Sequence, residues 1–184
     1  MSTSTLTERG SGALGSPAQL AYEVNDVATA AAHWARHYGA GPFYVLEHVP
    51  LAMAECDGAP VPFDHSSAYG WHGHIMIELL QLHGEPPPPF RGGGPRLHHV
   101  AYRVPVLDTA ISTLSAAGHD LALRAQTAPG GNSEGTTFVF MDARSTHGHF
   151  IELYEDGSRL RAFYEFVEQA ANRWDGFSDP VRAL

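Results

Sequence analysis

The sequence predicts an α+β fold made of two tandem βαβββ units followed by a C-terminal helix. The first observation is an internal repeat, because segment 19–24 is matched eighty residues later by segment 99–104. The second is that the unit ends correspond, since Ile77-Glu78-Leu79 resembles Ile151-Glu152-Leu153. Matches at both ends of two similar units, in the same order, indicate a duplication. Identities at the offset of eighty include Ala21 with Ala101, Tyr22 with Tyr102, Val24 with Val104, Thr29 with Thr109, and Ala30 with Ala110.

The first unit is expected to span residues 18–83. Its alternating segment Gln19–Val24 predicts a strand. Asn25 or Asp26 then serves as the N-cap of an Ala-rich helix that runs to about Tyr38, where Gly39 ends it. Three further strands are expected near Phe43–Val49, Asp64–Trp71 and His74–Gln81.

The second unit is expected to span residues 97–156. It begins with a strand at His99–Val104, followed by a helix from about Leu107 to Ala117 that ends at Gly118. Its remaining strands are expected near Asp120–Gln126, Thr136–Asp142 and His149–Tyr154. Between the units, residues 84–96 contain four consecutive Pro and three consecutive Gly, a composition typical of a linker.

Both chain ends are expected to lie outside the two units. Residues 1–17 are rich in Ser, Thr and Gly without an apolar h-region, which predicts a disordered tail and not a secretory signal. Residues 157–184 contain a predicted helix from about Ser158 to Trp174, whose apolar side packs on the domain or on a dimer partner. No apolar stretch approaches 18 residues, so we expect a cytoplasmic protein without a membrane span.

The composition excludes several function classes. A net charge of −9 disfavours partners such as nucleic acids or anionic membranes. All 11 basic residues are Arg, so Schiff-base chemistry and a P-loop lysine are excluded. The single Cys56 excludes an internal disulfide and a multi-Cys metal site. Twelve His residues are many for 184 residues and prompt a search for a metal site.

In each unit a polar residue opens the first strand and a Glu lies near the end of the last strand. With this pattern, the region from Gln19 to Glu155 resembles the vicinal oxygen chelate superfamily. That superfamily includes glyoxalase I, methylmalonyl-CoA epimerase, extradiol dioxygenases and bleomycin resistance proteins. The stretches 97–104 (LHHVAYRV) and 145–153 (STHGHFIEL) are most similar to the epimerase-like branch. The resemblance implies that the units form a cupped mixed sheet with a metal inside the cup, and we expect a homodimer.

The resemblance also implies four metal ligands from the first and last strands of both units. Strand alternation is compatible with this set, because within each strand the implied ligand shares a face with the residues two and four positions away, and these faces can line one side of the sheet. One imidazole, one amide and two carboxylates suit a divalent ion (Zn, Co, Ni, Mn or Fe) with open water positions. The same alternation predicts that His98 points away from the cup. The implied ligands are Gln19, Glu78, His99 and Glu152.

Candidate catalytic and substrate-binding residues follow from the same faces. In relatives of this type a metal-adjacent Glu takes a proton from a carbon next to a carbonyl, a role that Glu152 or Glu78 would have here. His74 is a second candidate, four residues before Glu78 on the same face. Glu23 and Arg103 occupy equivalent positions and are expected to point into the cup, where they set selectivity or form an ion pair. The predicted aromatic walls include Tyr44, Tyr69, Trp71, Phe138, Phe140 and Phe150.

The predicted function is a metal-dependent lyase or isomerase, epimerase-like, that acts by proton transfer on a small carbonyl-containing metabolite. Glutathione is disfavoured, because the positions four residues from the ligands hold Glu23, Leu82 and Pro95 in place of Arg and Asn. One alternative is a small-molecule binding or resistance protein, with or without a metal. A third is an Fe(II) extradiol-type dioxygenase, which needs two His and one Glu.

Overall fold

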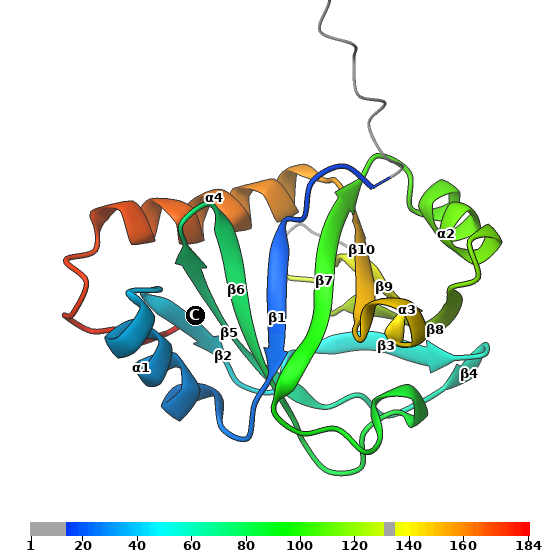
Figure 1. Cartoon of the computed structure of the whole chain (residues 1–184), viewed down its shortest axis with the longest axis horizontal. Coiled ribbons are helices and arrows are strands. Elements are labelled where there is room, and N and C mark those ends of the chain that lie inside the picture. Colours follow the sequence, from blue (N-terminus) through cyan, green and yellow to red (C-terminus); the bar gives the residue numbers. More distant parts are fainter. Residues whose placement is uncertain (1–13, 131–134) are drawn as a thin grey trace, which may run out of the picture.

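The computed structural model describes residues 14–130 and 135–184, so most of the tail predicted at 1–17 lies outside the described residues. Within them the chain forms one large curved sheet with helices packed on it (Figure 1), which confirms the predicted α+β class. The first half contains β1 (Gln19–Glu23), α1 (Val27–Tyr38), β2 (Phe43–Leu46), β3 (Leu51–Cys56), β4 (Ala59–Pro60), β5 (His65–His72), β6 (Ile75–Leu82) and the 3-10 helix η1 (Pro88–Phe90). The second contains β7 (Arg96–Val104), α2 (Leu107–Ala116), β8 (Asp120–Thr127), β9 (Thr137–Asp142), α3 (Arg144–His147), β10 (Phe150–Glu155), α4 (Ser158–Arg173) and β11 (Val181–Ala183).

The sheet order shows the duplication directly. The strands follow one another as β11-β2-β5-β6-β1-β7-β10-β9-β8-β3-β4. The run β2-β5-β6-β1 of the first half mirrors the run β8-β9-β10-β7 of the second. β1 and β7 meet antiparallel at the centre, and each pairs in parallel with the last strand of its own half, β6 or β10.

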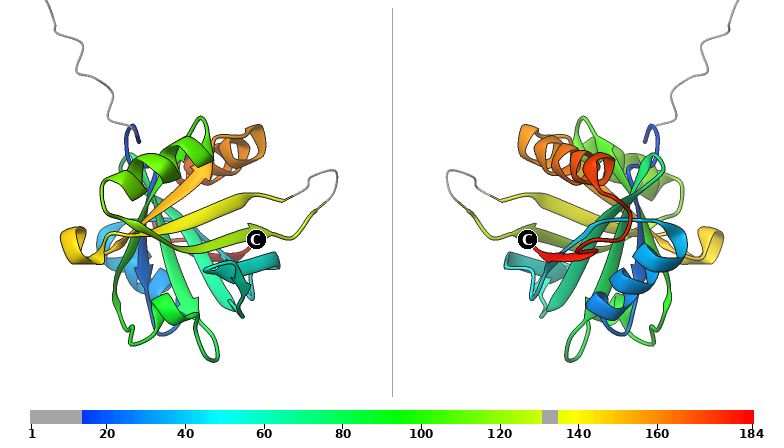
Figure 2. Two further views of the ribbon diagram at one scale, coloured as in Figure 1. Left: turned by 90° about the vertical axis from the view of Figure 1, so that its right-hand side faces the viewer. Right: turned by 90° about the vertical axis from the view of Figure 1, so that its left-hand side faces the viewer.

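The helices cover opposite faces of the sheet. α1 and α2 pack on the convex face, one on each half, through residues such as Val27, Ala31, Leu107 and Leu114 (Figure 1). α4 packs on the concave face, where its buried residues contact Met76 of β6, and Figure 2 shows it on the other side of the central strands from α1. None of the helices in the described part of the chain is long and apolar enough to cross a bilayer.

Capping residues set the ends of α1 as the sequence predicts. The Asp26 carboxylate accepts a hydrogen bond of 2.7 Å from the backbone N–H of Thr29, one of the orphan donors of the first turn. Gly39 ends the helix in the left-handed conformation, with φ of 66°. Asp26 therefore serves as the N-cap, and Asn25 does not.

The hairpin of β3 and β4 was not predicted from the sequence. It belongs to the first half in the chain, yet β3 pairs antiparallel with β8 at the edge of the second half. This crossover ties the two halves together. Nothing local predicts it, because the burial of β3 does not alternate and its partner lies some seventy residues away.

A bulge in the centre of the sheet changes the orientation of one residue. Ala21 of β1 pairs with His99, whereas Tyr22 pairs with Leu97, so His98 is an extra residue on β7. As a result His98 packs among Phe90, Phe140 and Phe150 on the concave side. The prediction that strand alternation turns His98 away from the cup is wrong for this reason.

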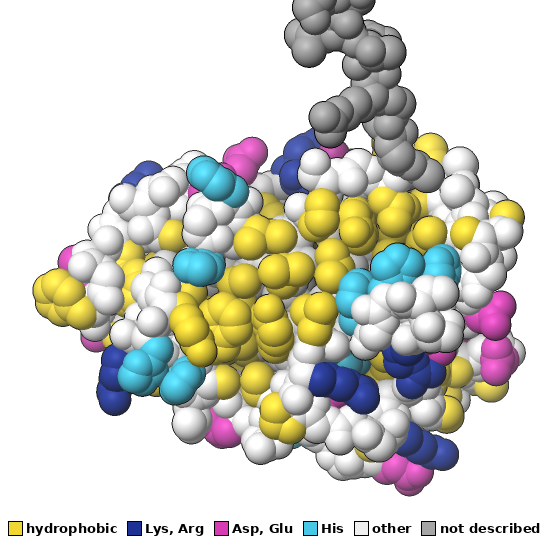
Figure 3. Space-filling view, viewed as in Figure 1, with side chains coloured by type: hydrophobic (Ala, Val, Ile, Leu, Met, Phe, Trp, Pro, Cys, Tyr) yellow, Lys and Arg dark blue, Asp and Glu magenta, His cyan; other side chains and the backbone are white. Residues whose placement is uncertain are grey.

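The convex face between α1 and α2 is rich in apolar side chains (Figure 3). Leu20, Tyr22 and Tyr102 are half-buried there against the cores of the two halves. A face of this kind is compatible with association of two copies. The homodimer nevertheless stays a prediction.

Candidate metal centre

Four central strands bring together the four residues that the resemblance implied as ligands. Glu78 comes from β6, Gln19 from β1, His99 from β7 and Glu152 from β10, and these strands are neighbours in the sheet. Each half therefore contributes two of the four. All four side chains are between 1% and 4% exposed.

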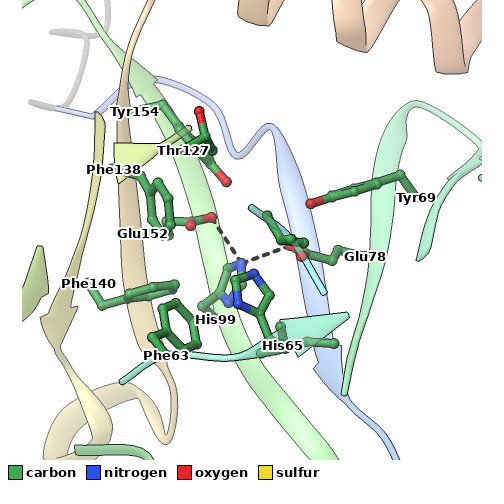
Figure 4. Close-up of a pocket in the computed structure, with 12 residues that line it drawn as sticks. Phe63, His65, Tyr69, Glu78, His99, Thr127, Phe138, Phe140, Glu152 and Tyr154 are labelled. Atoms are coloured by element: carbon green, nitrogen blue, oxygen red, sulfur yellow. Dashed lines mark ion pairs between the residues drawn. The ribbon is translucent and has the colours of Figure 1, made fainter. Parts of the chain in front are cut away.

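The polar atoms of these side chains converge on the Nε2 atom of His99, and Figure 4 shows its ion pairs with Glu78 and Glu152. This Nε2 atom lies 3.0 Å from Oε2 of Glu152, 3.3 Å from Oε2 of Glu78 and 3.5 Å from Nε2 of Gln19. The Gln19 amide also donates a short hydrogen bond to Oε2 of Glu78. Ligand atoms of Glu78, His99 and Glu152 all lie within 4.8 Å of one another, a spacing that one cation can bridge.

Neighbouring residues hold these side chains in place. The Ser67 hydroxyl donates to Oε1 of Glu78 at 2.6 Å, and the Tyr164 hydroxyl of α4 donates to Oε1 of Gln19 at 2.9 Å. Nδ1 of His99 shares a hydrogen bond of 2.9 Å with Nδ1 of His98, so the second ring nitrogen is held and Nε2 faces the centre. Such supports are typical of metal-ligating side chains. Sequence reasoning missed Ser67 and Tyr164, because no local pattern links them to the ligands.

The charges at the centre are unbalanced without a cation. Burial alone would lower the pKa of His99, but the Glu152 and Glu78 carboxylates raise it to about 9. For Glu152, burial raises the pKa more than His99 lowers it. For Glu78, burial also raises the pKa, but His99 and the Ser67 hydroxyl outweigh burial and lower it overall. Two buried carboxylates thus share one imidazole, an arrangement that a bound cation would stabilise.

The donor set fits a divalent cation. Oε2 of Glu152 is buried and makes no well-aligned hydrogen bond to any described residue. The Gln19 amide would bind a cation through its oxygen, and a half-turn of the amide group exchanges Oε1 and Nε2. The nitrogen would then face the Tyr164 hydroxyl, which can also accept a hydrogen bond. Mixed N/O donors of this kind suit first-row divalent ions better than a closed structural zinc site.

Comparison with known proteins agrees with this fold. Residues 18–140 match the family model described as the glyoxalase/bleomycin resistance protein/dioxygenase superfamily. The chain belongs to this superfamily. The recognition made from the sequence is therefore confirmed. No curated protein matches the sequence significantly.

Solved structures of the superfamily share the fold at low sequence identity. Methylmalonyl-CoA epimerase from Mycobacterium tuberculosis is 20% identical, with a TM-score of 0.50 over 82% of this chain and 93% of that chain. A hypothetical protein from Bacillus halodurans C-125 is 19% identical, with a TM-score of 0.52 over 78% of this chain and 95% of that chain. At such identities the likeness concerns the fold alone.

A second group of possible ligands lies at the surface. His48, Asp64 and His83 have ligand atoms within 4.8 Å of one another. His48 and Asp64 are exposed and already paired at 2.7 Å, and Nε2 of His83 is 2.7 Å from the Ser66 hydroxyl. These side chains are already paired with one another or with Ser66, so the buried centre is the stronger candidate for a cation site.

The candidate metal centre borders a cavity that we describe as two adjacent chambers, because they share part of their lining. We call the part around the candidate ligands the inner chamber; it has a volume of about 40 Å³. The part under α4 is the outer chamber, with a volume of about 220 Å³. Four residues line both chambers and so form their junction: Val49, Tyr69, Thr127 and Tyr154.

His65 is a member of the inner chamber that sequence reasoning missed. Its ring is buried, stacks on Phe63 at 4.2 Å, and lies beside His99 and Glu78 (Figure 4). Burial lowers the pKa of His65 to about 4, although Glu78 acts in the opposite direction. The ring is therefore neutral at physiological pH. In the sequence His65 is the second residue of the predicted strand Asp64–Trp71, with no motif around it, so only the fold reveals its position.

His74 does not reach the cavity. The strand predicted near His74–Gln81 begins one residue later, because β6 starts at Ile75. His74 lies in the turn after β5, next to Gly73 with φ of 61°, and it is exposed. Strand alternation predicts that His74 shares a face with Glu78, but this rule does not apply to His74 because the residue lies outside the strand.

Three of the predicted aromatic wall residues also lie elsewhere. Tyr44 packs on Phe166 at 4.7 Å, outside both chambers. The Trp71 indole donates to the backbone carbonyl of Gly73, near the turn. Phe150 is buried in the aromatic cluster around His98. By contrast, Tyr69, Phe138 and Phe140 line the inner chamber as expected.

Glu23 and Arg103 do not form the predicted pair. β1 and β7 are antiparallel, so Glu23 lies opposite Arg96 at one end, while Arg103 lies beyond Gln19 at the other. Oε2 of Glu23 is 3.1 Å from Arg96, and burial raises its pKa against the effect of that guanidinium. Arg103 lies 3.8 Å from Asp156 and over the Tyr164 ring. Because the two duplicated strands run antiparallel, the equivalent residues Glu23 and Arg103 lie at opposite ends of the strand pair and cannot contact each other.

Proposed function

We propose that this protein is a divalent-metal-dependent isomerase or lyase that moves a proton at the carbon next to a carbonyl group. The observation that carries the proposal is the convergence of the buried side chains of Gln19, Glu78, His99 and Glu152 beside a small chamber that is also lined by the neutral imidazole of His65. A cation bound there would supply Lewis-acid stabilisation of negative charge on a carbonyl oxygen. The likeness in fold to methylmalonyl-CoA epimerase is compatible with isomerase chemistry.

Glu152 is the better candidate for the base of the two carboxylates. Glu78 accepts hydrogen bonds from Ser67 and Gln19, and its pKa is lowered. Oε2 of Glu152 lies 3.0 Å from Nε2 of His99 but accepts no well-aligned hydrogen bond from a described residue, and burial raises the pKa of this carboxyl group. A less solvated carboxylate with a raised pKa is the better proton acceptor.

The neutral His65 ring supplies a second group that can hold a proton in the same chamber. The ring stacks on Phe63 and lines the same chamber as Glu78. An epimerase needs proton acceptors and donors on two sides of the reacting carbon, and a lyase needs one acid and one base. We assign Glu152 and His65 to these two roles.

Solvent exchange tests the proposal without knowledge of the product. Candidate 2-methylacyl thioesters and 2-hydroxy ketones would be incubated with metal-loaded protein in D₂O and followed by NMR. We expect deuterium at the carbon beside the carbonyl for at least one compound class. Exchange should fall about 10²–10⁴-fold in Glu152→Gln and stay unchanged in Glu155→Gln, an exposed residue of the same strand.

The other outcomes decide between the remaining functions. Binding of these compounds without exchange or turnover would favour a binding or resistance protein. Oxygen consumption with a catechol would favour a dioxygenase, although the buried group contains a single His with two Glu. Metal analysis of protein purified without chelators should show about one divalent ion per chain. His83→Ala serves as the control for the surface group and should retain that ion.

A further inference from the structure

The two chambers differ in what they can hold. About 40 Å³ in the inner chamber is room for the oxygen atoms of a substrate and the carbon between them. The outer chamber has about 220 Å³, whereas an apolar cavity of about 150 Å³ binds a benzene molecule. A substrate anchored at the candidate metal centre must therefore place the rest of its body in the outer chamber.

The walls of the outer chamber are mostly apolar. Leu46 and Pro50 come from the first half, and Leu160, Phe163 and Leu184 come from the C-terminal segment. Phe163 packs edge-on against Tyr69 at 5.0 Å, so the wall is continuous with the junction between the chambers. An exposed Arg159 lies at the rim. A wall of this composition favours aliphatic or aromatic groups over charged ones.

α4 fixes the outer chamber relative to the candidate metal centre. Tyr164 lines the chamber and at the same time donates a hydrogen bond to Gln19. The Arg103 guanidinium lies over the same ring, 5.1 Å from its centroid. Because Tyr164 contacts both Gln19 and the outer chamber, it fixes the distance between the metal centre and the site for the apolar part of a ligand.

We propose that the outer chamber binds the apolar part of the substrate, and that the substrate is a carbonyl compound carrying a group about the size of a phenyl ring or a hexyl chain. This inference rests on the proposed function, because it assumes that substrate oxygens bind at the candidate metal centre. It adds the substrate class and the residues that select it. Phe163 and Leu46 determine specificity, since they line the outer chamber and not the inner one.

Two hydroxamates provide the test, because both bind divalent metals through two oxygens and differ only in the chain. Zn²⁺-loaded protein of known metal content would be titrated with acetohydroxamate and with hexanohydroxamate by calorimetry. We expect hexanohydroxamate to bind at least tenfold more tightly, since each additional methylene group that is buried in the outer chamber adds favourable binding free energy. Phe163→Trp fills the chamber and should reduce this preference at least fivefold while acetohydroxamate affinity stays the same. Phe166→Trp, an exposed position on the same helix, should leave both affinities unchanged.

Leu46→Trp narrows the chamber from the other wall and replaces Phe163→Trp if that variant does not fold. Equal affinities of the two hydroxamates for the metal-loaded wild type would overturn the outer chamber as a substrate site and leave the metal centre standing. A wild type that takes up no Zn²⁺ would overturn the proposed function and, with it, this inference.

Discussion

At the scale of single residues, the candidate metal centre depends on side chains that do not themselves touch the centre. Tyr164 is the clearest case, because it is 145 residues away from Gln19 in the chain and yet its hydroxyl is hydrogen-bonded to the Gln19 amide group. In the same way, His98 is hydrogen-bonded to the His99 ring, and the Ser67 hydroxyl donates a hydrogen bond to the Glu78 carboxylate. Such supporting hydrogen bonds typically change metal affinity by about 10–100-fold.

Tyr164→Phe should therefore weaken metal binding without unfolding the chain. The substitution removes one hydroxyl and keeps the ring that packs with Leu160 and Val167. We expect the affinity for Zn²⁺, measured by competition with a chromophoric chelator, to fall about tenfold or more. Tyr102→Phe on the convex face removes a hydroxyl far from the centre and should have no effect. An unchanged affinity in Tyr164→Phe would show that the Gln19 amide needs no support from α4.

Gly70 is required by close packing on β5. A Cβ atom at this position would lie 2.6–2.9 Å from three ring carbons of Phe43, which is fully buried. Gly70→Ala should therefore lower the free energy of unfolding by about 1–3 kcal/mol, as overpacking does in other cores. Urea denaturation measures this change. The double variant Gly70→Ala/Phe43→Leu should be more stable than the sum of the single changes predicts; strict additivity would contradict the clash.

At the scale of elements, the ends of helices and strands determine which side chains reach the cup. The N-cap and C-cap of α1 could be predicted, because Asp26 and Gly39 act through local hydrogen bonds and backbone conformation. The start of β6 could not, since only the tertiary pairing of Ile75 with His72 shows where the turn begins. His74 was misplaced for that reason.

The N-cap of α1 gives a prediction with a defined pH dependence. Asp26→Ala should lower the free energy of unfolding by about 1 kcal/mol, whereas Asp26→Asn should preserve most of the cap. The hydrogen bond from Thr29 lowers the pKa of Asp26 below its ordinary value. Its stabilisation is therefore present above the pKa of the unfolded chain and is lost as the pH falls through the lower folded-state pKa.

Urea denaturation of the wild type and both variants between pH 7 and pH 3 measures this effect. The difference between wild type and Asp26→Ala should shrink as the solution is acidified, because protonation removes the charge of the cap. The difference between Asp26→Asn and Asp26→Ala should stay constant over the same range, since neither side chain titrates. A gap between wild type and Asp26→Ala that grows on acidification would contradict the assigned pKa direction.

The bulge at His98 shows a second limit of sequence prediction at this scale. Alternation correctly placed Gln19, Glu78, His99 and Glu152 on one concave face, because each lies in a regular stretch of its strand. One extra residue on β7 reverses the rule for His98, and bulges leave little trace in a single sequence. The placement of β3 beside β8 has the same character, because it depends on a long-range pairing.

At the scale of the whole molecule, the two halves form one structure and not two independent units. β1 and β7 pair at the centre, β3 crosses to the far edge of the second half, and α4 packs back onto the first. The candidate ligands are divided equally between the halves. The duplication predicted this division, because equivalent strands carry equivalent residues.

A divalent ion bound at this centre should therefore stabilise both halves together. We expect Zn²⁺ at about one hundred times its dissociation constant to raise the free energy of unfolding by about 2.7 kcal/mol relative to EDTA-treated protein. Hydrogen exchange followed by mass spectrometry should show slower exchange in peptides from both β6 and β10. In Glu152→Gln this protection should be lost in both, although the substitution lies in the second half only. Protection confined to one half would mean that the ion binds elsewhere. The alternative site is the surface group of His48, Asp64 and His83 on the first half. The variant His83→Ala tests that site directly.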